Sequence, residues 1–147
     1  SVRDPELGLV GEVSEINPSF LLELLEKEFL PVISPIGVTR NGIGLNLNAD
    51  LVAGAIGGSL KADRVLFMTD VLGIYEEYPN PDSLIGEIKF SDLSAKTSQF
   101  EDGMAPKVEA LLNAIRSGAK SAYVFDGRSA VNLKLALSGH IGTRVIP

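Results

Sequence analysis

Short apolar segments with the pattern of β-strands alternate with segments of helical periodicity along this 147-residue chain. The expected strands cover 7–15, 29–34, 64–69, 121–125 and 143–146, and the expected helices cover 18–28, 51–60, 91–96, 104–117 and 129–137. Strands that alternate with helices favour a mainly parallel sheet with helices packed on both of its faces. The sequence therefore predicts an α/β fold, a three-layer sandwich with a mainly parallel central sheet.

A hairpin around Asn41-Gly42 is the clearest departure from that pattern. Asn-Gly between two alternating segments favours a two-residue type I′ turn, and in that register Val38 faces Leu45. Asn46 and Asn48 then lie on the opposite, nearly bare face, where a ligand could approach the backbone and use both side-chain amides. A solvated polar face explains the hairpin taken alone equally well.

Two further junctions place acidic residues at the ends of expected elements. Asp50 precedes helix 51–60, whose glycines each weaken it by roughly 1 kcal/mol relative to alanine and are expected to allow close packing against a neighbouring element. Asp70 follows strand 64–69 and precedes Gly73. Open α/β sheets bind ligands outside the carboxyl ends of their strands, so Asp70 is a candidate binding residue.

Lys107 lies in the first turn of helix 104–117, next to Pro106. A helix begins with a partial positive charge of about +0.5, so a lysine there is unfavourable by a few tenths of a kcal/mol. A lysine at this position is favourable if an anion binds to the free backbone N–H groups of the helix and to the lysine ammonium together. From position alone, a solvated lysine on a surface turn is the alternative.

The charge balance and the residue types present exclude several classes of function. The chain has 13 Lys and Arg against 19 Asp and Glu, a net charge of -6, which argues against binding to nucleic acid or to an anionic membrane. With no cysteine and one histidine, a disulfide, a thiolate zinc site, a cysteine nucleophile and a multi-histidine metal site are impossible. The most apolar helix candidate, 51–60, has about half of the ~20 residues that span a bilayer, so we expect a cytoplasmic protein without membrane partners.

Four motifs in register resemble the N-acetyl-L-glutamate kinase branch of the amino acid kinase superfamily. They are residues 46–50 (Asn-Leu-Asn-Ala-Asp), 69–74 (Thr-Asp-Val-Leu-Gly-Ile), 103–109 (Gly-Met-Ala-Pro-Lys-Val-Glu) and 126–128 (Asp-Gly-Arg). Shorter matches at 8–13, 16–18, 31–33 and 35–37 extend the resemblance to nearly all of 7–146. Each motif alone is weak, but their common order and spacing is specific to the superfamily and fairly specific to this branch.

The resemblance implies a role for each of these motifs. Asn46, together with Asn48, would bind an acyl amino acid, and Asp50 would organise two catalytic lysines, one of which is Lys107. The nucleotide site would be lined by Asp70, Val71, Leu72, Gly73, Ile74, Tyr75, Gln99, Phe100 and Glu101. The resemblance also implies ATP with Mg²⁺ held largely by its phosphates, without metal ligands from this chain. No serine, cysteine or histidine nucleophile is required, because phosphoryl transfer needs positioning and charge neutralisation more than covalent catalysis.

The resemblance also implies an activity and a domain organisation. The γ-phosphoryl group of ATP would move to the side-chain carboxylate of N-acetyl-L-glutamate in arginine biosynthesis, in an enzyme expected to form a homo-oligomer. The family's glycine-rich loop and its first catalytic lysine would lie before residue 1, so the chain resembles the second half of such an enzyme. Residues 1–62 would finish the amino-acid lobe and 63–147 would form the nucleotide lobe. The alternatives are a related kinase acting on carrier-bound aminoadipate and a non-catalytic nucleotide-binding or regulatory fragment.

The carboxy-terminal part departs from the pattern of the arginine-inhibited members of this family. Their last helix carries a glutamate that can receive the inhibitor's guanidinium, and an acidic loop follows it. Here no acidic residue follows Asp126, and Lys134 or Ala136 occupies the approximate place of that glutamate. The resemblance therefore implies weak or absent inhibition by arginine.

Overall fold

A four-stranded sheet forms the centre of the carboxy-terminal part of the chain. The computed structural model describes residues 8–100 and 103–147. The strand order is β3 (Val65–Thr69), β5 (Ala122–Asp126), β6 (Thr143–Ile146) and β4 (Glu87–Lys89). The pairs β3–β5 and β4–β6 are parallel, whereas β5–β6 is antiparallel. The mainly parallel sheet is therefore confirmed, and the reversal of β6 beside β5 is a feature that the sequence pattern did not predict.

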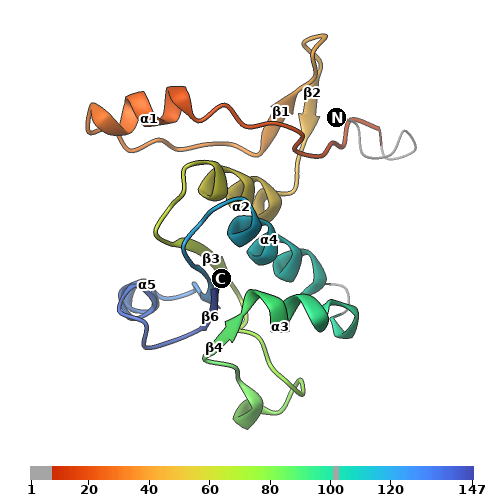
Figure 1. The fold of residues 1–147 in the computed structure, drawn as a ribbon, viewed down its shortest axis with the longest axis vertical. Helices are drawn as coiled ribbons and strands as arrows, with labels where there is room; N and C mark the ends of the chain where they lie inside the picture. The colour runs from red at the N-terminus through yellow and green to blue at the C-terminus, as the bar shows by residue number, and fades with distance from the viewer. Residues whose placement is uncertain (1–7, 101–102) are drawn as a thin grey trace.

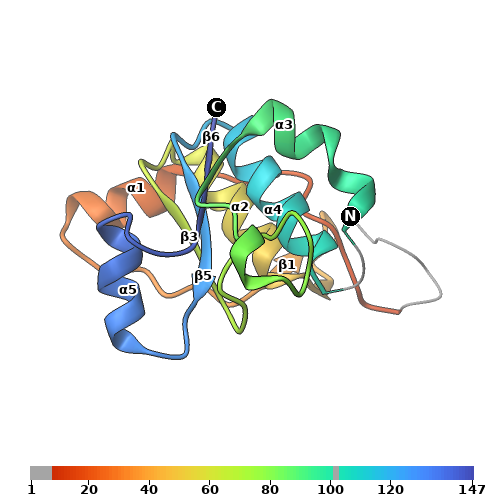
Figure 2. The ribbon, with the colours of Figure 1, turned by 90° about the horizontal axis from the view of Figure 1, so that it is seen from below.

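Helices cover both faces of this sheet. Figure 2 shows the strands nearly edge-on, with α5 (Ala130–Leu137) on one side and α2 (Ala49–Ser59), α3 (Phe90–Ala95) and α4 (Ala105–Arg116) on the other. Ser129 begins α5 as predicted, because its hydroxyl accepts a hydrogen bond from the Val131 N–H. These layers confirm the predicted α/β sandwich.

The hydrophobic core lies between β5 and α4. Every residue of β5 is buried, as expected for a central strand with helices on both faces. From α4, Val108, Leu111 and Ile115 pack into the same cluster, which agrees with the apolar face predicted for this helix. Because α4 is fixed by its whole length against the sheet, the position of its amino terminus is well defined.

The glycines of α2 allow a close approach to α4. A Cβ atom added to Gly54 would lie 2.7 Å from the backbone oxygen of Ala110, and one added to Gly58 would overlap the Ser117 side chain. A Cβ atom added to Gly57 would likewise overlap the Val65 side chain of β3. The predicted use of these glycines for close packing is therefore confirmed, and the contact brings the start of α2 beside the start of α4.

The amino-terminal part contains α1 (Ser19–Glu26) and a hairpin of β1 (Ile36–Val38) and β2 (Gly44–Asn46). Figure 1 shows both elements at the end of the molecule opposite β4, above α2. Of the strand predicted for 7–15, the described residues show only a single bridge from Val10 to Asn46. The buried strand predicted for 29–34 was wrong: Leu30 is 88% and Val32 94% exposed, since this segment pairs with no strand in the described part of the chain.

The hairpin register differs by one residue from the prediction. Thr39 donates its N–H to the Ile43 carbonyl, which leaves a three-residue loop, 40–42, in which Gly42 has a φ of +81°. Val38 therefore pairs with Gly44, and Leu45 pairs with Gly37 instead of with Val38. A shift of one residue reverses the faces, so Leu45 is buried while Val38 shares the exposed face with Asn46.

The chain between β3 and β4 makes an excursion away from the sheet. It contains the 3₁₀ turn η2 (Pro81–Ser83), and a second turn, η3 (Thr97–Gln99), follows α3. Tyr75 and Leu84 form a bridge that closes the excursion at its base. Among the residues described, no helix is long and apolar enough to cross a membrane.

Candidate active site

Lys107 and Asp50 form an ion pair between the starts of two packed helices. The Lys107 Nζ lies 3.0 Å from Asp50 Oδ2, and the two side chains are only 24% and 27% exposed. Asp50 lies in the first turn of α2 and Lys107 in the first turn of α4. Two residues 57 positions apart in the sequence are therefore joined by the close packing of these helices.

A cavity of about 790 Å³ opens beside Lys107. Its walls come from the loop after β3, from the segment after α3 and from the start of α4. The lining residues are Asp70, Val71, Tyr75, Tyr78, Gln99, Phe100, Gly103, Met104 and Lys107. Tyr75 and Tyr78 meet edge to face, with ring centroids 5.7 Å apart, so aromatic surface lies in the same cavity as the Lys107 ammonium and the Asp70 carboxylate.

A second charged cluster lies at the carboxyl ends of β3 and β5. Arg128 donates to both carboxylate oxygens of Asp126, at 2.9 Å and 2.7 Å, and the Arg128 N–H adds a third hydrogen bond at 3.0 Å. These hydrogen bonds lower the pKa of the Asp126 carboxyl to about 2. The same pair raises the pKa of Arg128, with a smaller contribution from the negative charge of Asp70.

The loop after β3 is only partly exposed to the cavity. Asp70, Val71 and Tyr75 line it, together with Gln99 and Phe100 from the other predicted segment. Gly73 and Ile74 are buried behind this surface, and Leu72 is half exposed elsewhere. Glu101 lies outside the described residues.

The two asparagines predicted for substrate binding are in different environments. The Asn48 side chain caps α2, where its Oδ1 accepts the N–H of Leu51 at 3.1 Å. Asn46 is exposed on β2, and its backbone bonds to the segment at Leu9 and Gly11. Asn48 thus fixes the helix that carries Asp50, while the Asn46 amide faces open space on the hairpin.

Three residues that line the cavity were missed by the sequence reasoning: Tyr78, Gly103 and Met104. Gly103 and Met104 belong to the motif that contains Lys107, so the motif held a signal for them. Tyr78 lies in the excursion between β3 and β4, and no pattern in the sequence indicates that this excursion folds back to the cavity. Asp126 and Arg128 belong to the motif at 126–128, but no role was predicted for either.

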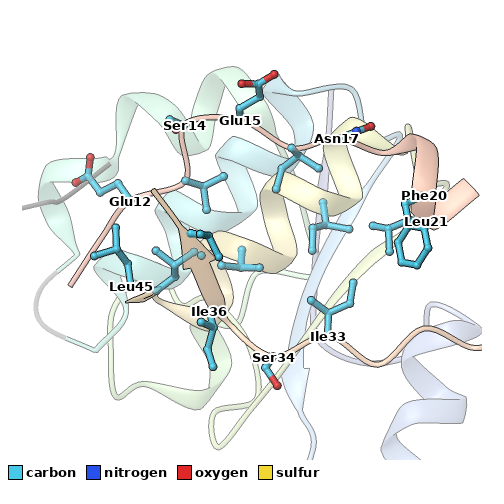
Figure 3. A pocket seen from close by; sticks show the side chains of 17 residues that line it. Glu12, Ser14, Glu15, Asn17, Phe20, Leu21, Ile33, Ser34, Ile36 and Leu45 are labelled. Carbon is cyan, nitrogen blue, oxygen red and sulfur yellow. The ribbon is translucent and has the colours of Figure 1, made fainter. Parts of the chain in front are cut away.

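A separate hollow of about 440 Å³ lies in the amino-terminal part. Figure 3 shows apolar side chains, among them Leu21, Ile33 and Leu45, gathered between β1, α1 and the segment 12–17, with the carboxylates of Glu12 and Glu15 at its edge. None of the predicted site residues lines this hollow.

The described residues include no group of three or more His, Cys, Asp or Glu side chains that could hold a metal ion. A magnesium ion at this site would therefore need most of its ligands from a bound nucleotide or from water. Asp70 is the carboxylate that lines the cavity and could contribute to such a shell.

Comparison with known sequences supports a single family. Residues 1–126 match the amino acid kinase family. Acetylglutamate kinase from Corynebacterium glutamicum is 40% identical over 144 residues, which are 97% of this chain and 49% of that protein. Acetylglutamate kinase from Methanothermobacter thermautotrophicus is 42% identical over 137 residues, 92% of this chain and 47% of that protein. The chain spans about half the length of these relatives.

Comparison with solved structures gives the same fold. Carbamate kinase from Giardia lamblia bound to AMP-PNP superimposes with a TM-score of 0.72 and 27% sequence identity. The superposition covers 93% of this chain and 46% of that protein. AMP-PNP is bound in that structure, and the shared fold extends through almost all of this chain.

Proposed function

Because the chain belongs to the amino acid kinase family, we propose that its protein transfers the γ-phosphoryl group of ATP to the side-chain carboxylate of N-acetyl-L-glutamate. A carboxylate oxygen of the acceptor attacks the γ-phosphorus, the bond to the β,γ-bridging oxygen breaks, and an acyl phosphate and ADP are formed. This reaction would serve arginine biosynthesis. The observation that carries the proposal is the Lys107–Asp50 pair at the cavity.

Lys107 is the residue that would stabilise the transferred phosphoryl group. Its ammonium lines the cavity and is held by Asp50 at 3.0 Å, so it is oriented before any substrate arrives. The amino terminus of α4 adds a partial positive charge beside it, and within the described residues no side chain caps that terminus. A preorganised cation at a developing negative charge is the main contribution that a protein makes to phosphoryl transfer.

The cavity beside Lys107 fits a nucleotide in size and in chemistry. Tyr75, Tyr78 and Phe100 offer flat apolar surface for a base, while Lys107 and the start of α4 lie where phosphates would be received. Magnesium supplies charge neutralisation when bound to the ATP phosphates. Asp70 would hold that ion or its water ligands at the edge of the sheet.

The acyl amino acid would bind on the other side of the ion pair. Asn46 lies exposed on β2, and the helix that follows leads directly to Asp50. We therefore assign 1–62 to the amino-acid lobe and 63–147 to the nucleotide lobe, with Asp50 and Lys107 meeting where they join. Asn48 would contribute to this site through its cap on α2.

The decisive assay measures ADP release by the full-length protein with N-acetyl-L-glutamate against other acceptors, among them aminoadipate on its carrier. The expected result is turnover that depends on N-acetyl-L-glutamate. Turnover with carrier-bound aminoadipate alone would assign the protein to the related kinase, and nucleotide binding without turnover on any acceptor would contradict an enzymatic role.

Replacement of Lys107 tests its assigned role. In the full-length protein we expect Lys107→Ala to lower kcat by about 10²–10³-fold, as for the loss of one preorganised charge donor, with little change in ATP affinity. Asp50→Asn should act in the same way, and Asn46→Ala should mainly raise KM for the acyl amino acid. Lys120→Ala is the matched control, because Lys120 also pairs with an aspartate, Asp63, but both side chains are exposed. An unchanged kcat for Lys107→Ala would identify Lys107 as a surface lysine.

A further inference from the structure

Thr143 is a polar residue with no solvent exposure at the start of β6. Its hydroxyl accepts a hydrogen bond from the Ile74 N–H at 2.7 Å and donates one to the Ile85 carbonyl at 2.6 Å. The Ile85 N–H in turn donates to the Ile74 carbonyl at 2.8 Å. One side-chain hydroxyl therefore ties together three segments that are distant in the sequence.

The segment tied by Thr143 is the loop that lines the large cavity. Ile74 lies directly before Tyr75, which together with Asp70 and Val71 forms one wall of that cavity. The other end of the loop is held by β5, where the Gly127 N–H donates to the Thr69 carbonyl at 2.8 Å. The loop is thus fixed at both ends, by Gly127 at Thr69 and by Thr143 at Ile74.

Gly73 of the loop packs closely against Thr143. A Cβ atom added to Gly73 would lie 2.6 Å from the Thr143 Oγ1 and 3.1 Å from its backbone nitrogen. The backbone of the loop consequently lies directly on the start of β6. Removal of the hydroxyl would leave the buried Ile74 N–H and the partly buried Ile85 carbonyl without this partner, which is costly for the buried N–H, so the loop would move to recover water or another partner.

We propose that Thr143 is a positioning residue for nucleotide binding. Its hydroxyl holds the Ile74 end of the loop 70–75 against β6, and through Ile74 it fixes the place of Tyr75 in the cavity. The role rests on the proposed function, because the cavity is assigned to ATP there. Thr143 itself does not line the cavity and touches no substrate.

The test replaces Thr143 in the full-length protein and compares nucleotide binding with acceptor binding. Valine has the shape of threonine without the hydroxyl, and we expect Thr143→Val to raise KM for ATP about tenfold, the effect of one lost buried hydrogen-bond partner. The KM for the acyl amino acid and kcat should change by less than about twofold. Thr143→Ser keeps the hydroxyl and should retain the ATP affinity of the wild type. Hydrogen exchange at the Ile74 amide should be fast in Thr143→Val and slow in Thr143→Ser.

Each result decides for or against this role. An unchanged KM for ATP in Thr143→Val, or a serine variant as impaired as the valine variant, would overturn it. If Thr143→Val does not fold, the pair Thr143→Ser and Thr143→Ala isolates the hydroxyl in the same way, and equal ATP affinities would overturn it. Calorimetry with MgATP on the wild type separates the two proposals: no binding there contradicts the nucleotide site and Thr143's role with it, whereas binding that is equal in wild type and Thr143→Val contradicts only the role of Thr143.

Discussion

At the scale of single residues, the Asp126–Arg128 pair couples the stability of the fold to pH. Arg128 holds both oxygens of the Asp126 carboxylate, and these hydrogen bonds lower the Asp126 pKa from 3.8 to about 2. A carboxyl whose pKa is lower in the folded than in the unfolded state stabilises the fold above its unfolded pKa. That contribution is lost as the pH falls from about 3.8 to about 2.

The Asp126→Asn variant tests this coupling. We expect it to have a lower Tm than the wild type at neutral pH, and the difference should shrink as the pH falls through the interval between the two pKa values. Thermal unfolding followed by circular dichroism from pH 7 to pH 2 gives the measurement. Asp82→Asn, at the exposed turn η2, is the control and should leave the difference from wild type independent of pH. A constant difference for Asp126→Asn would contradict the ion pair.

The candidate site was predictable from the sequence one residue at a time, but its assembly was not. Lys107 was placed correctly in a first helical turn by Pro106 and by the helical periodicity that follows, whereas Asp50 was expected just before helix 51–60 and lies in the first turn of α2. That the two side chains meet depends on the packing of α2 on α4, which involves backbone contacts at glycines and leaves no periodic signal. The return of Tyr78 to the cavity likewise depends on tertiary structure, whereas the cap by Asn48 is a local contact with the Leu51 N–H that was not predicted.

At the scale of elements, the hairpin of β1 and β2 shows that the local sequence pattern predicts the position of the turn but not the register of the strands. Asn41-Gly42 correctly marks the turn, but Thr39 accepts the Ile43 N–H with its hydroxyl and pairs with Ile43 through the backbone, which adds one residue to the loop. The two registers differ by one residue and have opposite faces buried. Leu45 is buried in the observed register and lines the hollow of the amino-terminal part together with Val52 and Ile56 of α2, so elements outside the hairpin decide between the two registers.

The close α2–α4 contact predicts that a methyl group added at Gly54 lowers the stability of the protein. Gly54→Ala should gain up to about 1 kcal/mol of helix propensity but place a Cβ atom 2.7 Å from the Ala110 oxygen. Overpacking of this kind costs about 1–3 kcal/mol, so we expect a net loss in the free energy of unfolding in urea. Gly44→Ala, where the added Cβ meets nothing within 4 Å, should be close to neutral. Wild-type stability in Gly54→Ala would show that the two helices lie further apart.

The charged residues near the turn between α5 and β6 predict how strongly arginine inhibits the protein. A hollow of about 380 Å³ lies beside this turn, and Glu87 is the carboxylate that lines it. Arg144 already pairs with Glu87 at 3.2 Å, while Lys134 is exposed and Ala136 is buried. Among the described residues that line this hollow Glu87 is the one carboxylate, and an incoming guanidinium would have to displace Arg144 to bind it, which weakens the bidentate pairing that is its main source of affinity.

We expect arginine to inhibit the full-length enzyme weakly or not at all. An arginine titration of ADP release gives the measurement, and Arg144→Ala is the informative variant, because it frees Glu87 and should make any response to arginine stronger. Half-inhibition of the wild type at micromolar arginine would contradict the expectation and would show that another acceptor replaces the missing glutamate.

At the scale of the whole molecule, the two parts of the chain differ in how completely they bury their apolar residues. The carboxy-terminal sheet has a continuous core. Strands β3, β5 and β6 were predicted because each is a short apolar segment bounded by turn residues, whereas β4 was not predicted, because two of its three residues are charged. In the amino-terminal part, large apolar side chains lie exposed, among them Phe20, Phe29, Leu30, Val32 and Val38. The pattern of 29–34 indicated a buried strand. In the structure Pro31 and Ile33 line hollows together with residues of other elements, whereas Phe29, Leu30 and Val32 are exposed.

We expect the 147-residue chain alone to be inactive as a kinase. The chain spans about half the length of its relatives, and the resemblance places a second catalytic lysine and most substrate contacts outside residues 1–147. Catalytic groups that act as a unit lose nearly all of their effect when one is absent, so ADP release should be at least about 10³-fold slower than in the full-length protein. A cooperative thermal transition, followed by circular dichroism, would establish that the isolated chain is folded under the assay conditions. Turnover by the folded chain at a rate comparable to the full-length protein would show that Lys107, Asp50 and Asn46 suffice for catalysis.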